Sequence, residues 1–265
     1  MASFDLIENL PFTTEATIGS VARIGLVVLS SDYTVENEFR QVFTRPGMDV
    51  FHSRIENAPN ITPDTLAAMG PLITETASRL LPGDTLDVLA YGCTSASMVL
   101  GPDQVNQLLL AAKPEARVTN PVSAAFAAFD ALGAKRLAVL TPYRSDVNAI
   151  VAKGLEAGGY EVVVFGSFNE EMDPVVASID DKSLKAAIGT ITEGRDVDAV
   201  FVSCTSVRLM HVVAEIEAET GLPVTSSNHA MAWHCLRLAG DDRALPEMGR
   251  LFQLPLSGGG GGGDA

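Results

Sequence analysis

Basic residues and cysteines are scarce in this sequence. Its 265 residues include 18 lysines and arginines against 33 aspartates and glutamates, which gives a formal net charge of −15. So acidic a surface repels nucleic acid and anionic membranes over most of its area. The three cysteines, Cys93, Cys204 and Cys235, are too few and too far apart for a disulfide framework or a cysteine-rich zinc module.

Targeting and cofactor motifs are missing as well. No apolar run approaches the roughly 18 residues of a membrane span, and the N-terminus lacks the basic region of a secretion signal. A G-x-x-x-x-G-K-[ST] loop does not occur, and G-x-G-x-x-G occurs only in the C-terminal polyglycine. The four histidines lack the spacing of a metal site. We therefore expect a cytoplasmic protein without cofactor or metal that contacts neither nucleic acid nor membrane.

The sequence does contain an internal repeat. Three pairs of similar segments begin at Arg23 and Arg136, at Gly47 and Gly159, and at Asp87 and Asp198. Their offsets are 113, 112 and 111 residues, so the matches are collinear. Three weak matches in nearly one register indicate two copies of one structural unit.

Each copy has the pattern of an α/β unit. Apolar runs with the length of buried strands occur at 24–29, 88–91, 137–140 and 199–202. Stretches of helical periodicity separate them, which is typical of a parallel sheet covered on both faces. One helix is predicted from an N-cap at Thr62 to Pro82-Gly83, and another over about 183–192. The predicted fold class is α/β, with two pseudo-symmetric doubly wound parallel-sheet lobes and the active site in the cleft between them.

The lobes are not simply the two halves of the sequence. Alanine-rich helical patterns at 124–132 and 230–238 follow two matching Val-Thr segments, and each is able to carry the chain to the opposite lobe. We predict a first lobe over 20–118 that is completed by 230–255, and a second lobe over 119–229. The glycine-rich end, 256–265, is predicted to be a disordered tail.

Nucleophilic and polar residues follow the predicted strands, at the edge where open parallel sheets bind ligands. Cys93 and Cys204 each stand where a strand is expected to become a helix, and the N–H groups of such a turn favour thiolate and bind carboxylate. The repeat places the two thiols on opposite walls of one cleft, where they can act as acid and base or as nucleophile and proton donor. The hydroxyls that follow them are candidate substrate-binding groups: Thr94, Ser95, Thr205 and Ser206.

The paired Gly-Cys-Thr-Ser and Ser-Cys-Thr-Ser motifs in a repeated α/β chain resemble the aspartate/glutamate racemase superfamily. This superfamily includes amino-acid racemases, arylmalonate decarboxylase and maleate cis–trans isomerase. The resemblance covers roughly residues 20–250 and is strongest to the maleate isomerases. The chain is also similar to the isomerase-like protein encoded with ectoine-utilisation enzymes. The resemblance implies a cofactor-independent isomerase, a small carboxylate substrate and a homodimer.

The resemblance also implies further substrate-binding positions. Tyr143 matches the tyrosine of a Thr-Pro-Tyr turn, Asn169 matches an asparagine in a later turn, and Asp32 stands where the maleate isomerases have a carboxamide. An ionised Asp32 would repel a dianion such as maleate. Three explanations are open: Asp32 is protonated, it turns away, or the substrate carries an amino or amide group at that end.

The reaction that the resemblance implies is cis–trans isomerisation. Cys93 thiolate adds to an olefinic carbon, the carbon–carbon bond rotates, and elimination returns the trans isomer, with Cys204 as proton donor or partner thiol. The alternative is an amino-acid or ectoine-derived racemase in which the two thiols alternate as base and acid. Decarboxylation is less favoured, because that branch resembles a one-cysteine arrangement. A small-carboxylate binding protein is the alternative from another class, although a binder needs neither cysteine.

Overall fold

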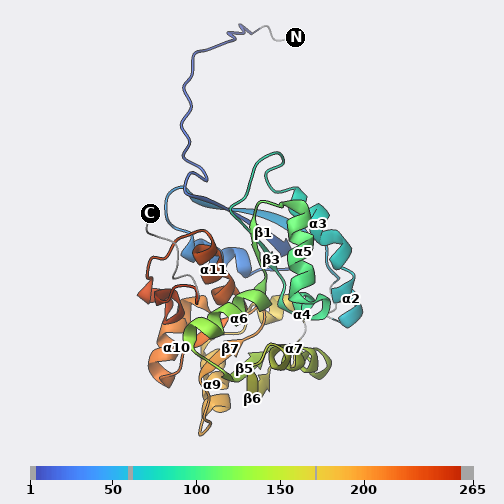
Figure 1. Cartoon of the computed structure of the whole chain (residues 1–265), viewed down its shortest axis with the longest axis vertical. Coiled ribbons are helices and arrows are strands. Elements are labelled where there is room, and N and C mark those ends of the chain that lie inside the picture. The colour runs from blue at the N-terminus through green and yellow to red at the C-terminus, as the bar shows by residue number, and fades with distance from the viewer. Residues whose placement is uncertain (1–3, 59–61, 171, 258–265) are drawn as a thin grey trace, which may run out of the picture.

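The computed structural model describes residues 4–58, 62–170 and 172–257, and Figure 1 shows how they are arranged. The strands are β1 (Ala22–Leu29), β2 (Met48–Ile55), β3 (Val88–Gly92), β4 (Arg117–Thr119), β5 (Arg136–Thr141), β6 (Glu161–Ser167), β7 (Ala199–Val202) and β8 (Val224–Ser226). The helices are α1 (Val35–Val42), α2 (Pro63–Ala67), α3 (Gly70–Ser78), α4 (Thr94–Leu100), α5 (Pro102–Ala112), α6 (Pro121–Leu132), α7 (Ser145–Ala157), α8 (Asp173–Val176), α9 (Asp181–Thr192), α10 (Val213–Thr220) and α11 (Ser227–Leu238). Short 3-10 turns lie at Met210–Val212, Pro246–Met248 and Leu251–Gln253.

The described strands form two parallel sheets with the same strand order. One is β2-β1-β3-β4 and the other is β6-β5-β7-β8. All pairings in both sheets are parallel. The α/β fold class with two pseudo-symmetric lobes, predicted from the repeat, is thereby confirmed.

Equivalent aspartates tie the strands together at the start of each lobe. The Asp87 carboxylate accepts a hydrogen bond from the backbone N–H of Arg23 at 2.7 Å. In the second lobe Asp198 accepts from the N–H groups of Lys135 and Arg136 at 2.8 and 2.7 Å. Because Asp87 and Asp198 are repeat partners, the sequence repeat preserves an interaction as well as a hydrophobic pattern.

Alternate residues of the first sheet point into two separate cores. Val27, Leu89 and Tyr91 pack against helices α2, α3 and α5 on one face. Ile24 and Val88 pack on the opposite face against α1, α6 and α11. A parallel sheet covered on both faces needs this continuous apolar sequence, and that is why the central strands were recognisable as uninterrupted apolar runs.

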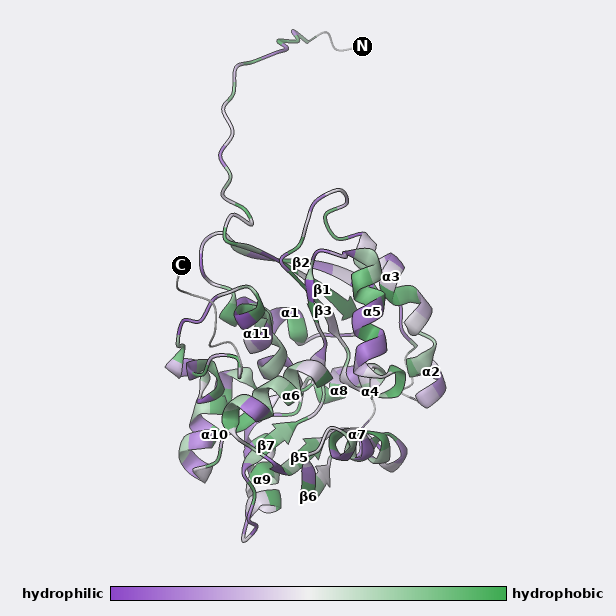
Figure 2. Ribbon diagram, viewed as in Figure 1, coloured by the Kyte–Doolittle hydropathy of each residue, from purple (hydrophilic) through white to green (hydrophobic). Residues whose placement is uncertain are grey.

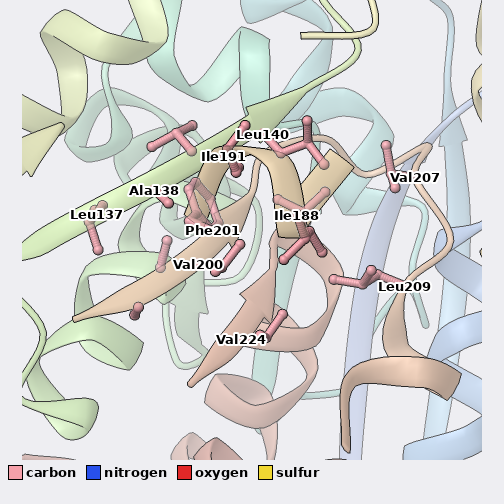
Figure 3. Packing of buried hydrophobic residues seen from close by; sticks show 14 of the residues in the cluster. Leu137, Ala138, Leu140, Ile188, Ile191, Val200, Phe201, Val207, Leu209 and Val224 are labelled. Atoms are coloured by element: carbon pink, nitrogen blue, oxygen red, sulfur yellow. The ribbon is translucent and has the colours of Figure 1, made fainter. Parts of the chain in front are cut away.

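The second sheet has its own core. Figure 3 shows Ile188 and Ile191 of α9 beside Phe201 of β7 and Leu140 of β5, all within one cluster of buried side chains. In Figure 2 strands β5 and β7 are hydrophobic along most of their length, whereas α5 and α10 carry both hydrophilic and hydrophobic residues. Helix α9 therefore has the inward face that the 183–192 pattern predicted, with Leu184, Ile188 and Ile191 buried.

Two helices cross between the lobes. Helix α6 follows β4 of the first sheet, yet Phe129 and Ala125 on it belong to the core of the second sheet. Helix α11 follows β8 of the second sheet and packs with Trp233 and Leu236 into the core of the first. The two helices also pack against each other, on the small residues Ala124 and Ala128 among others. The chain thus passes from each sheet to the other at equivalent points of the repeat.

The helix predicted from Thr62 to Pro82 is broken into two. Thr62 is the N-cap and its hydroxyl accepts from the N–H of Thr65 at 3.2 Å, as expected. Helix α2 ends at Ala67, however, and α3 begins at Gly70. Pro71, the second residue of α3, has no N–H to bond to the preceding turn and its ring would clash there, so the helix restarts at this point.

The N-terminal residues lie apart from this core. Residues 4–16 have no regular secondary structure and extend away from the first lobe (Figure 1). The predicted glycine-rich tail lies, from residue 258 onward, outside the described residues. None of the helices in the described part of the chain is long and apolar enough to cross a membrane.

The close packing of α6 on α11 predicts a steep response to added volume. Ala128 is fully buried in this contact, so Ala128→Leu should lower the free energy of unfolding by about 1–3 kcal/mol. Ala186→Leu, at an exposed position of α9, is the matched control and should change it by less than about 0.5 kcal/mol. Urea unfolding of both variants measures the difference. Equal, small effects would mean that the helix pair is loosely packed.

Candidate active site

Cys93 lies at the junction of β3 and α4. It is the N-cap of α4, with extended backbone angles, and its carbonyl accepts from the Ser97 hydroxyl at 2.7 Å. Its Sγ lies 3.7 Å from the Ser95 Oγ. The preceding Gly92 fits a close approach of strands, because a Cβ there would lie 3.3 Å from the carbonyl oxygen of Val27. This is the strand-to-helix turn predicted for Cys93.

Cys204 has a different backbone setting from the one predicted. It follows β7, but residues 205–207 form a turn and a bend, and 208–209 are irregular. The first α-helix after it, α10, begins only at Val213, after the 3-10 turn Met210–Val212. The expectation that Cys204 stands where a strand becomes a helix was therefore wrong. A single backbone donor reaches the thiol, because the N–H of Ser206 points at Sγ at 3.3 Å.

The two cysteines line one narrow cavity of about 20 Å³, room for about one or two water molecules. Of the residues predicted to bind substrate, Ser95, Tyr143, Thr205 and Ser206 line it too. The cavity walls are completed by residues that sequence reasoning did not single out: Leu29, Asn57, Ala58, Thr65, Leu66, Met69 and Asp173. A four-carbon acid does not fit this volume, so substrate entry requires the walls to move apart.

Both thiols are difficult to ionise in this cavity. Burial raises the pKa of Cys93 from 9.0 to about 11, although the Ala96 N–H and the Ser95 hydroxyl oppose the rise. Burial raises the pKa of Cys204 further, to about 12, against the opposing effect of Tyr143 and Ser206.

Tyr143 is placed to donate a proton in a hydrogen bond. Its side chain is buried and interacts with the Cys204 thiol and with Ser95. Burial, together with the adjacent Cys204, raises the pKa of the phenol well above its ordinary value. The phenol therefore stays neutral, and its O–H remains available to an oxygen or sulfur atom in the cavity.

Asp32 turns away from the cavity. Its Oδ1 accepts from the N–H groups of Thr34 and Val35 at 2.7 and 2.8 Å, at the start of α1. Its Oδ2 is buried without a hydrogen-bond partner, and burial raises the pKa of the carboxyl from 3.8 to about 6. Asp32 instead borders an outer hollow of about 540 Å³, which Ser31 and Asp173 also line.

Two of the predicted residues do not reach the cavity. Thr94 is buried, and its hydroxyl donates to Ser227 at the start of α11 at 2.8 Å. Asn169 is exposed and does not line the cavity, and its own backbone has a φ of 55°. Asn57, which follows β2 as Asn169 follows β6, lines the cavity instead. Its amide donates to the Ser31 hydroxyl at 2.8 Å.

A buried carboxylate on α1 holds the loop that follows Cys204. Glu38 Oε1 accepts from the backbone N–H groups of Leu209 and Met210 at 2.8 and 2.7 Å. Its Oε2 accepts from the Asn228 amide at 2.8 Å, and the same amide donates to the carbonyl of Thr205 at 2.7 Å. Glu38 belongs to the first lobe and this loop to the second, so the network fixes Cys204 relative to the first lobe.

Two parallel α/β lobes each contribute a thiol to one shared cavity, and this arrangement defines an enzyme. A thiol at a helix N-terminus, a second thiol beside a neutral phenol and several hydroxyl donors supply nucleophilic and proton-transfer chemistry. The class of enzyme is a cysteine-based isomerase.

Comparison with known proteins identifies the family. Residues 24–252 match the arylmalonate decarboxylase family, and the chain belongs to it. A maleate isomerase of Nocardia farcinica is 31% identical over 243 residues, which are 88% of this chain and 96% of the relative. An arylmalonate decarboxylase of Bordetella bronchiseptica is 29% identical over 198 residues, 73% of this chain and 82% of the relative.

The fold is also similar to solved structures of maleate isomerases. The maleate isomerase Iso of Pseudomonas putida S16, in a cysteine-to-alanine variant with maleate, has a TM-score of 0.78 at 26% identity, and the match covers 88% of this chain and 97% of that one. A cysteine-to-serine mutant of the Nocardia farcinica maleate cis–trans isomerase contains a covalently bound succinylcysteine intermediate. Its TM-score is 0.79 at 28% identity, with 88% of this chain and 98% of that chain covered.

The raised thiol pKa predicts slow, pH-dependent alkylation of the free protein. Below its pKa of about 11, the thiolate fraction of Cys93 rises about tenfold per pH unit. The rate of carbamidomethylation of Cys93 by iodoacetamide, followed by peptide mass spectrometry, should rise in this way from pH 7 to 10. Cys235, whose pKa burial raises further, is the internal control and should react more slowly. A plateau of the Cys93 rate near pH 8 would contradict this environment.

The Glu38 network predicts how stability depends on pH. Burial raises the pKa of Glu38 from 4.5 to about 7, so the folded protein binds this proton more tightly than the unfolded chain. The corresponding stability, on the order of 3 kcal/mol, is present at low pH and is lost as pH rises from about 4.5 to about 7. Glu38→Gln should remove this part of the pH dependence in urea unfolding. Glu36→Gln, on the same helix, should keep it, and an unchanged profile in Glu38→Gln would contradict the assignment.

Proposed function

We propose that this enzyme catalyses cis–trans isomerisation of maleate or a related small unsaturated carboxylate. The observation that supports this most is the single narrow cavity that contains one thiol from each lobe. The relatives named maleate isomerases and the succinylcysteine seen in one of them support the same reaction type. Small carboxylates are the partner class, and the family resemblance also implies a homodimer.

The proposed reaction begins with Cys93 as a thiolate and Cys204 as a thiol. The Cys93 sulfur forms a bond to one olefinic carbon, and the electron pair of the double bond moves to the other. This second carbon takes a proton from Cys204, which leaves a saturated thioether and a Cys204 thiolate. The former double bond is now single and free to rotate.

The reverse steps release the product. Cys204 thiolate removes the proton from the rotated carbon, the electron pair reforms the double bond in the trans arrangement, and the Cys93–carbon bond breaks. Both thiols return to their starting protonation states, so no external acid, base or oxidant is consumed. In the proposal Tyr143, Ser95, Thr205 and Ser206 donate hydrogen bonds to substrate carboxylate.

Asp32, Thr94 and Asn169 have weaker support as substrate-binding residues. Asp32 is engaged at the start of α1, Thr94 binds Ser227, and Asn169 is exposed. For these positions the proposal requires movement when the cavity opens. Asn57 is the better-supported carboxamide, because it already lines the cavity.

Substitution of each thiol tests the proposal. Proton NMR in heavy water should show fumarate forming from maleate with the unmodified protein. Cys93→Ala should abolish turnover, and Cys204→Ser should slow it by at least about a thousandfold, while both proteins remain folded. Cys235→Ala is the matched control, because Cys235 is buried in α11 outside the cavity and should be dispensable for turnover.

The same NMR measurement distinguishes the proposed isomerase from an amino-acid racemase. Loss of the Cα–H signal of aspartate or another single-enantiomer amino acid, without fumarate from maleate, would replace isomerisation by a two-thiol racemisation. Full activity of Cys93→Ala on maleate would remove the proposed mechanism. An unchanged rate in Cys204→Ser would show that the second thiol only fills space.

A further inference from the structure

One carboxylate of the protein lines the cavity that contains the two thiols. Asp173, the first residue of α8, lines the cavity together with Cys93 and Cys204. Among the described residues that line it, Asp173 has the only charged side chain. Its negative charge acts on both thiols, since it contributes to raising the pKa of each.

Hydroxyl donors from both lobes hold this carboxylate in place. Ser31, which follows β1, donates to Oδ2 at 2.5 Å, and Ser206, which follows β7, donates to Oδ1 at 2.8 Å. Asn57 in turn donates to the Ser31 hydroxyl at 2.8 Å. Hydrogen bonds to a charged group are among the stronger ones, so Asp173 is a fixed part of the wall.

A fixed carboxylate that forms no ion pair favours one kind of substrate. Arg54 borders the outer hollow that Asp173 also lines, but in the described part of the chain its ion pair is with Glu36 and not with Asp173. A carboxylate offers about four acceptor positions, and the two serines use two of them. The remaining positions accept N–H donors but repel a second carboxylate. A dicarboxylate bound here would place two like charges side by side in a partly buried site.

We propose that Asp173 is a specificity-determining residue that selects the half-amide of a cis-enedioate. This inference rests on the proposed isomerisation. The substrate carboxylate takes the neutral donors of the cavity, and the carboxamide N–H groups donate to Asp173. The chemistry of addition agrees, because a neutral carboxamide accepts the displaced electron pair more readily than a carboxylate that is already negative. The other steps are those of the proposed isomerisation: Cys93 adds to the olefinic carbon, Cys204 gives and then removes a proton, and elimination restores the double bond. The product is the trans half-amide.

Asp173→Asn tests this directly, since it replaces an acceptor by a side chain that also donates. The wild type should favour maleamate over maleate by at least about tenfold in kcat/KM, and Asp173→Asn should shift the ratio of the two toward maleate by at least about tenfold. Asp173→Ser removes the charge with a smaller side chain and should bring the ratio of kcat/KM for maleamate and maleate close to one. This second variant keeps the test decisive if Asp173→Asn misfolds. Asp181→Asn on α9 is the matched control and should keep the wild-type ratio.

A binding measurement separates this inference from the proposed reaction. Succinamate and succinate, the saturated analogues, should protect Cys93 from iodoacetamide, with succinamate better in the wild type and succinate better in Asp173→Asn. That pattern without turnover of either unsaturated acid would sustain the role of Asp173 and remove the isomerisation. Turnover of maleate with an unchanged ratio in both Asp173 variants would overturn the role of Asp173 and leave the isomerase standing. Equal protection by both analogues in every variant would likewise overturn it.

Discussion

The burial of two thiols between two sheets is the constraint on which the rest of this structure depends. Burial raises the pKa of Cys93 and Cys204, and the groups that oppose the rise are neutral N–H and O–H donors. A thiolate formed there is poorly solvated, and addition to an electron-poor olefin relieves this by moving the negative charge onto the substrate. The strand ends, the covering segments around Leu66 and Asp173, and the lobe-to-lobe hydrogen bonds all surround this pair. The fold therefore holds two sulfur atoms at one small cavity.

The two lobes repeat the same sheet but differ where the chemistry lies. Cys93 begins a helix, whereas Cys204 enters a loop that Glu38 of the opposite lobe holds through backbone N–H groups. The difference gives the two thiols unequal environments, one at a helix N-terminus and one in a loop. Unequal thiols suit a reaction in which one adds to carbon and the other moves a proton. The crossing helices α6 and α11 join the two lobes, because each packs against the core of the opposite sheet.

The sequence was informative where residues interact locally or through the repeat. Uninterrupted apolar runs predicted the central strands, and the repeated Cys-Thr-Ser motif indicated that Cys93 and Cys204 share a site. The edge strands β2 and β6 are half-buried, so only the repeat hinted at them. Glu38 is indistinguishable in sequence from a solvated helix residue, because its backbone partners lie 171 and 172 residues away. Asp173 was missed for the same reason, although its position after β6 corresponds to α2 after β2, a segment that also lines the cavity.

The central claim is that Cys93 forms a covalent bond to substrate carbon and that Cys204 moves the proton. Intact-protein and peptide mass spectrometry of Cys204→Ser after incubation with maleate and acid quenching tests it most directly. The account predicts a mass gain of one molecule of the acid, confined to the peptide that contains Cys93. Water supplies the proton that Cys204 no longer gives, whereas elimination from the thioether lacks its base. No adduct on Cys93, or an adduct on Cys235 alone, would contradict it.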